Sequence, residues 1–307
     1  MLAELRFRVG TSRRRLLGWK PYPDPISPPC ALCGSDERAT VGERVAFDMR
    51  YRNVVCRACG LVYLCPRPDA AAFVDFYEHL YPRLYGKTKQ DETGSERGAA
   101  VAAFLEESLD VEGHTGVFDV GCGGGGLLRA VARAPRLGSL RLGGCDPGWP
   151  GASHAVLREG AAEIEIFKEG VEELGAALPS YSVFVLYDVI EHLLAPSEFL
   201  ATLHEHTTPG SVLFVSTSAL DNWREIPPAG WETYYLRLAH TYTFTKRTLA
   251  ALLRSRGWRP VVVADAPKGD QWVLAERADP EPAALEPSPG HYEEVLGMIA
   301  AYRKRLT

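Results

Sequence analysis

The sequence predicts an α/β fold with a mostly parallel sheet and an antiparallel last strand. From residue 115 onward, short apolar runs alternate with helical segments, which is the rhythm of βα units. The last two runs, 259–264 and 271–275, are separated by only six residues. That is too short for a crossover helix, so this pair should be antiparallel. The length of 307 residues fits one large domain plus a smaller attachment.

Seven strands are expected in the sheet of this domain, which we place at 113–276: 116–120, 140–145, 164–167, 183–187, 211–217, 259–264 and 271–275. Before it, 67–112 is predicted to form a helical lid, with 70–77 and 96–109 as its clearest helices. After it, 277–307 contains a proline-rich linker and a final helix over 291–305. The apolar residues of that helix recur at helical spacing, so we expect it to dock on the domain or on a second copy of the chain, as a homodimer.

Composition excludes several classes of protein. The net charge is −5, which argues against nucleic acid as a partner, and no apolar run approaches the roughly 20 residues of a membrane helix. The seven cysteines are an odd number, and four of them form two CxxC pairs. This pattern argues against a disulfide framework and for a reducing, cytoplasmic compartment. Residues 1–29 are predicted to be a basic, then proline-rich, arm.

The segment 30–66 carries the two CxxC pairs, formed by Cys30, Cys33, Cys56 and Cys59. Two residues between thiols let one tight turn aim both sulfurs at a point, and two such turns complete the tetrahedral shell that zinc prefers. Gly34 and Gly60 follow the pairs, where these turns often need a positive φ. The spacing predicts a zinc ribbon with a structural zinc. Two redox CxxC sites are the alternative, although neither pair opens an obvious helix.

A glycine-rich loop, FDVGCGGGG, follows the first predicted strand of the sheet. It fits the dinucleotide fingerprint GxGxxG at Gly121, Gly123 and Gly126. It also fits DxGxGxG, the loop of S-adenosylmethionine-dependent enzymes, at Asp119, Gly121, Gly123 and Gly125. Glycines let a ligand approach the main chain closely, and the following helix N-terminus adds free N–H groups. The loop therefore predicts a cofactor site but leaves the cofactor open.

Three further segments bear on the choice of cofactor, although the first of them suits both candidates. Asp146 ends the second strand, twenty residues after Gly126, and can reach the ribose hydroxyls of either cofactor. The fourth strand leads into DVIEHL at 188–193, and PGS precedes the fifth. In this order the motifs resemble a class I S-adenosylmethionine-dependent methyltransferase. That resemblance implies a seven-stranded, Rossmann-like sheet and S-adenosylmethionine as the cofactor.

The cysteine segment extends this resemblance to about residues 30–276. It reads CGLVYLCPRP and then FYEHLYP, similar to bacterial methyltransferases with an N-terminal zinc-binding segment. Members include C-methyltransferases of nucleotide-linked deoxysugars in antibiotic biosynthesis. The resemblance implies a small-molecule acceptor such as a sugar or natural-product intermediate. The chain ends about thirty residues after its last predicted strand, so we expect the extra C-terminal domain of the sugar enzymes to be absent.

Site roles follow partly from residue chemistry and partly from the resemblance. His192 is the best candidate for a general base, since an unperturbed histidine pKa of about 6.5 lies near working pH. Glu191 precedes it, and His240 is a second candidate; for both histidines the alternative is a pocket wall. Asp188 is placed near the methionine end of the cofactor or the acceptor, with helix capping as its alternative.

Aromatic residues supply the candidates for acceptor recognition. Tyr77, Tyr81 and Tyr85 recur at a spacing of four, on one helical face. The resemblance implies that this helix is a lid with a tyrosine, taken as Tyr81, pointing at the acceptor; a packing stripe is the alternative. The connection 216–245 is also rich in aromatics and long enough to be functional.

Three other functions fit parts of the sequence. An NAD-dependent dehydrogenase is permitted by GxGxxG, but Asp119, DVIEHL and the antiparallel last pair argue against it. A methyltransferase acting on RNA is conceivable because zinc ribbons occur in RNA-modifying enzymes, but the overall charge is acidic. A non-catalytic zinc-ribbon binding module would not need the intact glycine loop and the Glu-His pair.

Overall fold

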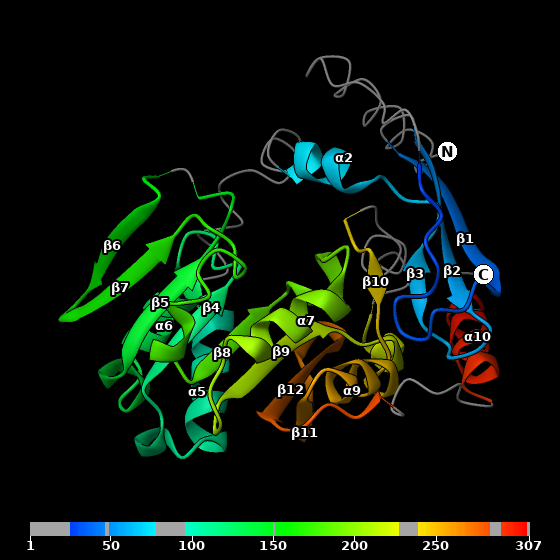
Figure 1. Cartoon of the computed structure of the whole chain (residues 1–307). Coiled ribbons are helices and arrows are strands. Elements are labelled where there is room, and N and C mark those ends of the chain that lie inside the picture. Colours follow the sequence, from blue (N-terminus) through cyan, green and yellow to red (C-terminus); the bar gives the residue numbers. More distant parts are fainter. Residues whose placement is uncertain are drawn as a thin grey trace.

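A computed structural model describes residues 25–46, 49–77, 96–149, 151–226, 239–282 and 290–305 (Figure 1). Its central feature is a mixed sheet of eight strands in the order β11-β12-β9-β8-β4-β5-β7-β6. These strands are β4 (Gly116–Val120), β5 (Arg141–Cys145), β6 (His154–Glu159), β7 (Ala162–Phe167), β8 (Val183–Tyr187), β9 (Val212–Ser218), β11 (Trp258–Ala266) and β12 (Asp270–Arg277). The α/β class predicted from the sequence is confirmed.

Five neighbouring strands of this sheet are parallel: β7, β5, β4, β8 and β9. The central strands β4 and β8 are apolar apart from Asp119 in β4, because helices cover both faces of a parallel sheet. β12 runs antiparallel to both β9 and β11, which confirms the prediction for the last pair. All five parallel strands therefore point their carboxyl ends, and the loops that follow them, to one edge.

The predicted count of seven strands is one too low, because β6 forms an eighth. β6 pairs antiparallel with β7 at the edge of the sheet, through a turn at Gly160 with φ +58°. Its residues alternate between exposed and half-buried, and its apolar run, Ala155–Leu157, is only three residues long, too short to predict a strand. The crossover from β5 to the parallel strand β7 thus holds a strand where βα units usually place a helix.

Helices cover both faces of the sheet. Helices α5 (Glu96–Ser108) and α6 (Gly126–Ala132) share one buried cluster with the sheet, while α7 (Pro196–Glu205) and α9 (Lys246–Ser255) share the other. The sequence prediction assigns α5 to the lid, but its Val101 and Leu105 are fully buried against the sheet. The helix α2 (Ala70–Asp75), capped by Asp69, lies apart from these four (Figure 1).

A second, four-stranded sheet is formed around the cysteine segment. It contains β1 (Arg38–Ala46), β2 (Met49–Cys56), β3 (Val62–Leu64) and β10 (Tyr242–Thr243), in that order, and all pairs are antiparallel. β10 comes from the long aromatic connection, about 180 residues after β3, so this sheet joins the N-terminal segment to the large domain.

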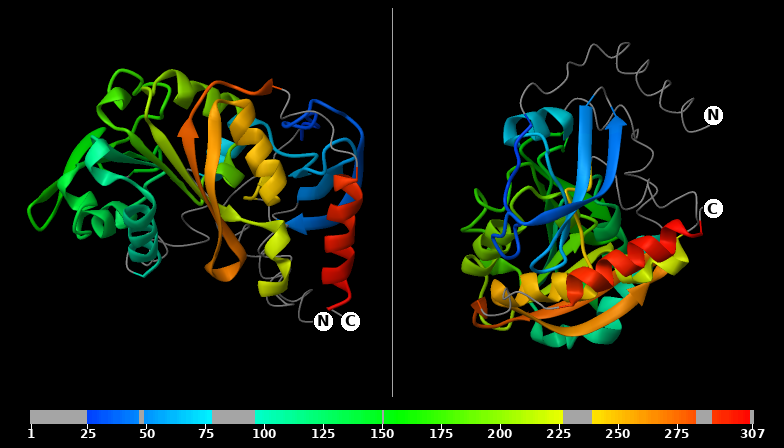
Figure 2. Two further views of the ribbon diagram at one scale, coloured as in Figure 1. Left: turned by 90° about the horizontal axis from the view of Figure 1, so that it is seen from below. Right: turned by 90° about the vertical axis from the view of Figure 1, so that its right-hand side faces the viewer.

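The last helix, α10 (His291–Arg303), packs beside this small sheet (Figure 2). Val295, Ile299 and Tyr302 are buried in one cluster with Val55 of β2 and Trp223. Docking on the domain is thus confirmed, while the homodimer stays a prediction. Trp223, expected among the acceptor-binding aromatics, is a core residue whose ring lies 6.1 Å from that of Tyr302.

Other expected aromatics, Trp231, Tyr234 and Tyr235, lie outside the described residues, as do Tyr81 and Tyr85. Within the described ranges, no helix has both the length and the apolar character needed to cross a bilayer.

Candidate functional site

The glycine loop turns sharply from β4 into α6, as its sequence predicts. Gly121, Gly123 and Gly125 all adopt positive φ, at +74°, +53° and +77°. Only glycine takes this conformation without strain. A Cβ on Gly121 would lie 2.7 Å from Cγ2 of Val189, in the segment after β8. The loop therefore packs directly against the segment that carries DVIEHL.

Two carboxyl groups, the buried Asp119 and the half-buried Asp146, flank the loop. The oxygens of Asp146 accept the N–H groups of Gly123 at 2.8 Å and Gly148 at 2.7 Å, so this side chain holds the loop in shape. Burial raises the pKa of Asp146, and burial followed by repulsion from Asp146 raises that of Asp119. A ligand that brings positive charge or hydrogen-bond donors to this corner would relieve the repulsion.

Asp188 follows β8 with a backbone φ of +56°, which is unusual for a residue other than glycine. Its carboxylate lies 3.4 Å from Nη2 of Arg97 in α5, and the same nitrogen is 2.7 Å from Asp270 of β12. The short helix η5 (Ile190–His192) follows, and its N-cap residue is Val189 rather than Asp188. Arg97 and Asp270 are not predicted as site residues from the sequence, because only the fold brings α5 and β12 to the end of β8.

His192, at the end of η5, is held through one nitrogen. Nδ1 lies 2.7 Å from the carbonyl oxygen of Ala239 and 2.9 Å from the hydroxyl of Tyr77, which itself donates to Ala239 O at 3.2 Å. A carbonyl only accepts, so Nδ1 carries the proton and the lone pair is on Nε2. Nε2 is then the basic nitrogen of this ring.

His240 and Glu191 complete the group around His192. The two imidazole rings lie 4.9 Å apart and nearly perpendicular, and one ligand atom of each of the three residues lies within 4.8 Å of the others. Oε2 of Glu191 is buried and has no hydrogen-bond partner in the described part of the chain. Burial, with repulsion from Asp188, raises the pKa of Glu191 to about 8. The group therefore presents two imidazoles beside a carboxyl that favours its protonated form.

The lid tyrosine that reaches this group is Tyr77. Its ring lies 6.1 Å from that of His192 in an edge-on arrangement. From the sequence, Tyr77 is predicted only to share a helical face with Tyr81 and Tyr85. Tyr81, the tyrosine expected to point at the acceptor, lies outside the described residues. Spacing on a helix could indicate the face but not which tyrosine would be in reach.

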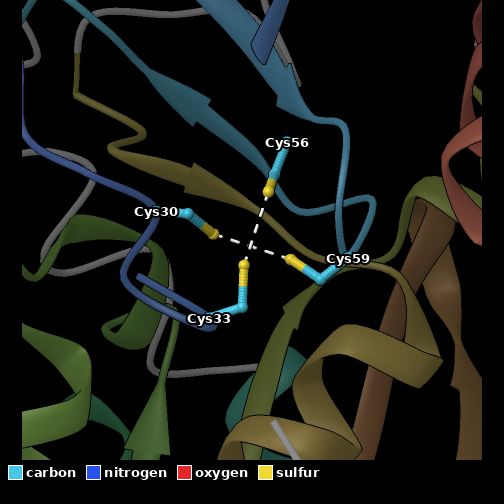
Figure 3. Close-up of side chains that lie close together, drawn as sticks. All are labelled: Cys30, Cys33, Cys56 and Cys59. Atoms are coloured by element: carbon cyan, nitrogen blue, oxygen red, sulfur yellow. Dashed lines mark hydrogen bonds between the residues drawn. The ribbon is translucent and has the colours of Figure 1, made fainter. Parts of the chain in front are cut away.

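The four cysteines of the CxxC pairs converge in a second site (Figure 3). Sγ of Cys30 lies 3.5 Å from that of Cys59, and Sγ of Cys33 lies 3.5 Å from that of Cys56. Four zinc–sulfur bonds of about 2.3 Å in a tetrahedron place the sulfurs about 3.8 Å apart, so the cluster fits zinc. Both turns close as predicted, with φ +74° at Gly34 and +78° at Gly60.

Comparison with known proteins identifies the large domain. A family model described as "Methyltransferase domain" matches residues 76–263, more than half of the chain. The "Ubiquinone biosynthesis O-methyltransferase" of Hahella chejuensis is 32% identical over 117 residues, covering 37% of this chain and 47% of that protein. The protein of the same name from Azotobacter vinelandii is 31% identical over 120 residues, covering 37% and 48%. The match thus spans about half the length of these relatives.

Two solved structures show the same fold. "Mitomycin 7-O-methyltransferase MmcR" has a TM-score of 0.50 and 20% identity, covering 67% of this chain and 60% of that one. The "plantazolicin methyltransferase BpumL", solved with SAH, has a TM-score of 0.50 and 14% identity, covering 68% and 95%. The family model, the order of the strands and the glycine loop agree, and the chain belongs to the methyltransferase-domain family.

Proposed function

We propose that this protein transfers a methyl group from S-adenosylmethionine to a small-molecule acceptor. The observation that carries this proposal is the contact between the glycine loop after β4 and the segment after β8. These two strands are parallel neighbours, so the cofactor loop and His192 share one edge of the sheet. The family match and the SAH-bound structural neighbour support the choice of cofactor.

The residues at this edge have separable tasks. Asp119, Asp146 and the glycine loop would hold the cofactor, whose sulfonium supplies the methyl group and leaves as a thioether. His192, fixed through Nδ1, would take the acceptor's proton on Nε2 as the new bond to the methyl carbon forms. His240 and Tyr77 would line the acceptor pocket, since both rings lie next to that of His192. Alignment of acceptor and methyl group supplies the rest of the rate enhancement.

The acceptor is proposed to carry an ionisable O–H or C–H group. The relatives named as O-methyltransferases support a hydroxyl acceptor. The resemblance to deoxysugar C-methyltransferases supports an acidic C–H group in a sugar or other natural-product intermediate. Both reactions need a base, and the position of His192 suits either.

Calorimetry tests the cofactor assignment. The purified protein is titrated with S-adenosylhomocysteine and, separately, with NADH, because the loop also matches the dinucleotide fingerprint. We expect binding of S-adenosylhomocysteine at one site and no heat with NADH. The reverse result would overturn the proposal in favour of a dehydrogenase, and heat with neither ligand would favour a non-catalytic binding module.

The cysteine cluster is proposed to hold a structural zinc ion. Four sulfurs leave zinc no open position, so the ion would stabilise the small sheet and take no part in methyl transfer. Metal analysis should find one zinc per chain, and Cys59→Ser should lose most of it. Iron in place of zinc, or two disulfides in thiol titration under anaerobic purification, would contradict this assignment.

A further inference from the structure

Arg67, three residues after β3, is a buried cation that has no carboxylate partner among the described residues. Its exposed fraction is 8%, and it forms no ion pair in the part of the chain that the structure describes. Nη2 donates to the carbonyl oxygen of Leu194 at 2.9 Å, and Nη1 donates to the hydroxyl of Tyr242 at 3.2 Å. Burying a charge costs free energy unless hydrogen bonds replace its contacts with water, so these two hydrogen bonds are needed to stabilise the buried guanidinium.

Both bonds lead to the segment that carries His192. Leu194 is two residues after His192, and its carbonyl also accepts the hydroxyl of Tyr242 at 3.0 Å. The chain just after η5 is therefore held by two side chains, one from Arg67, three residues after the end of β3, and one from Tyr242 of β10.

The main chain makes a second connection between the same parts. N–H of Leu64 in β3 donates to the carbonyl of Thr241 at 2.8 Å, and N–H of Thr241 donates to the carbonyl of Glu191 at 2.8 Å. Thr241 thus joins β3 to η5. Two residues earlier, Ala239 supplies the carbonyl that fixes Nδ1 of His192.

We propose that the small sheet positions His192, and that Arg67 is the positioning residue, called the latch below, whose hydrogen bonds connect the two. Arg67 holds Leu194, just after η5, and β3 holds Thr241, just before β10. The ring of His192 is therefore kept between two fixed segments. The inference rests on the proposed role of His192 as a base. The cysteine cluster supports this arrangement without taking part in methyl transfer, because Cys56 and Cys59 hold the turn that leads into β3.

The tautomer of His192 reports on the latch without any acceptor. Protein with ¹⁵N-labelled histidine is compared by long-range ¹H–¹⁵N NMR, with the ring of His192 assigned from a His192→Asn variant. The wild type should show the Nδ1–H tautomer. Arg67→Met should lose this signature and give a mixture of tautomers, and Arg67→Lys, which restores one charged donor, should recover part of it.

Arg57→Met is the matched control. Arg57 lies on the same segment but stacks over Tyr292 of α10, at 5.3 Å from the ring centroid, so its loss should leave the His192 spectrum unchanged. Affinity for S-adenosylhomocysteine should change by less than about twofold in Arg67→Met, because Arg67 holds Leu194 and Tyr242, which lie outside the glycine loop.

Retention of the wild-type tautomer in Arg67→Met would overturn the proposal, and so would an equal change in Arg57→Met. Where Arg67→Met does not fold, Tyr242→Phe decides: it removes one hydrogen bond to Leu194 and should shift the tautomer in the same direction, and no shift would refute the latch. The cofactor titration of the wild type is read separately, so a failure of the proposed function is distinguishable from a failure of the latch.

Discussion

At the scale of single residues, Asp188 is the point where local strain and the candidate site coincide. Its left-handed backbone costs about 1–3 kcal/mol. The conformation is held by N–H donation to Ser216 O at 3.0 Å and by the ion pair with Arg97. The strand end is thereby turned so that Val189, the residue after Asp188, lies against the glycine loop.

Two substitutions separate the backbone and charge contributions of Asp188. Asparagine tolerates the left-handed region better than alanine does, so Asp188→Asn should lose only the ion pair. Asp188→Ala should lose both and lower the free energy of unfolding by about 1 kcal/mol more than Asp188→Asn. Urea denaturation of the two variants measures the difference. Equal losses would show that the strain at this position is not significant.

At the scale of elements, predictability from the sequence followed the strength of the local pattern. β4 and β8 begin and end where continuous apolar runs predict them, because both faces of these strands are buried. β6 was missed because one of its faces is exposed, and β10 because two residues carry no pattern and its partner β3 is far away in the chain. Such pairings are decided by tertiary contacts.

The glycine loop allows a matched test of an element's geometry. Gly121 and Gly210 both have strongly positive φ, but a Cβ would lie 2.7 Å from Val189 at the first and would contact nothing within 4 Å at the second. Each change to alanine should cost about 1 kcal/mol of stability through the backbone. Only Gly121→Ala should also weaken S-adenosylhomocysteine binding, by about tenfold or more. Calorimetry compares them, and similar affinities in both variants would argue against the loop as the cofactor site.

At the scale of the whole molecule, the candidate site is assembled from segments that the sequence keeps far apart. Asp119, Asp146 and the glycines could be predicted because strand, loop and helix follow one another locally. The contact of Tyr77 with His192 spans 115 residues and the ion pair of Arg97 with Asp270 spans 173. No local pattern encodes such distances, so these partners emerge only from the fold.

The buried acids of this assembly predict how its stability depends on pH. Burial, followed by repulsion from Asp188, raises the pKa of Glu191 from its ordinary value to about 8, and burial also raises those of Asp119 and Asp146. Between the unfolded and folded pKa values, the folded state binds more protons than the unfolded state. Stability should therefore fall as pH rises through this window, by up to about 1.4 kcal/mol per pH unit for each group.

Glu191→Gln isolates the contribution of Glu191, because glutamine keeps the shape but cannot ionise. The variant should match the wild type in free energy of unfolding near pH 4 and exceed it near pH 8, because the wild-type carboxyl ionises freely on unfolding but stays protonated in the folded protein over most of this range. Urea denaturation is run with zinc in excess at every pH, because thiol protonation would otherwise add its own dependence. When the free energies of unfolding of the two proteins are subtracted at each pH, the contributions of all other titrating groups cancel. A variant that loses stability with pH as steeply as the wild type would show that Glu191 is already ionised in the folded protein.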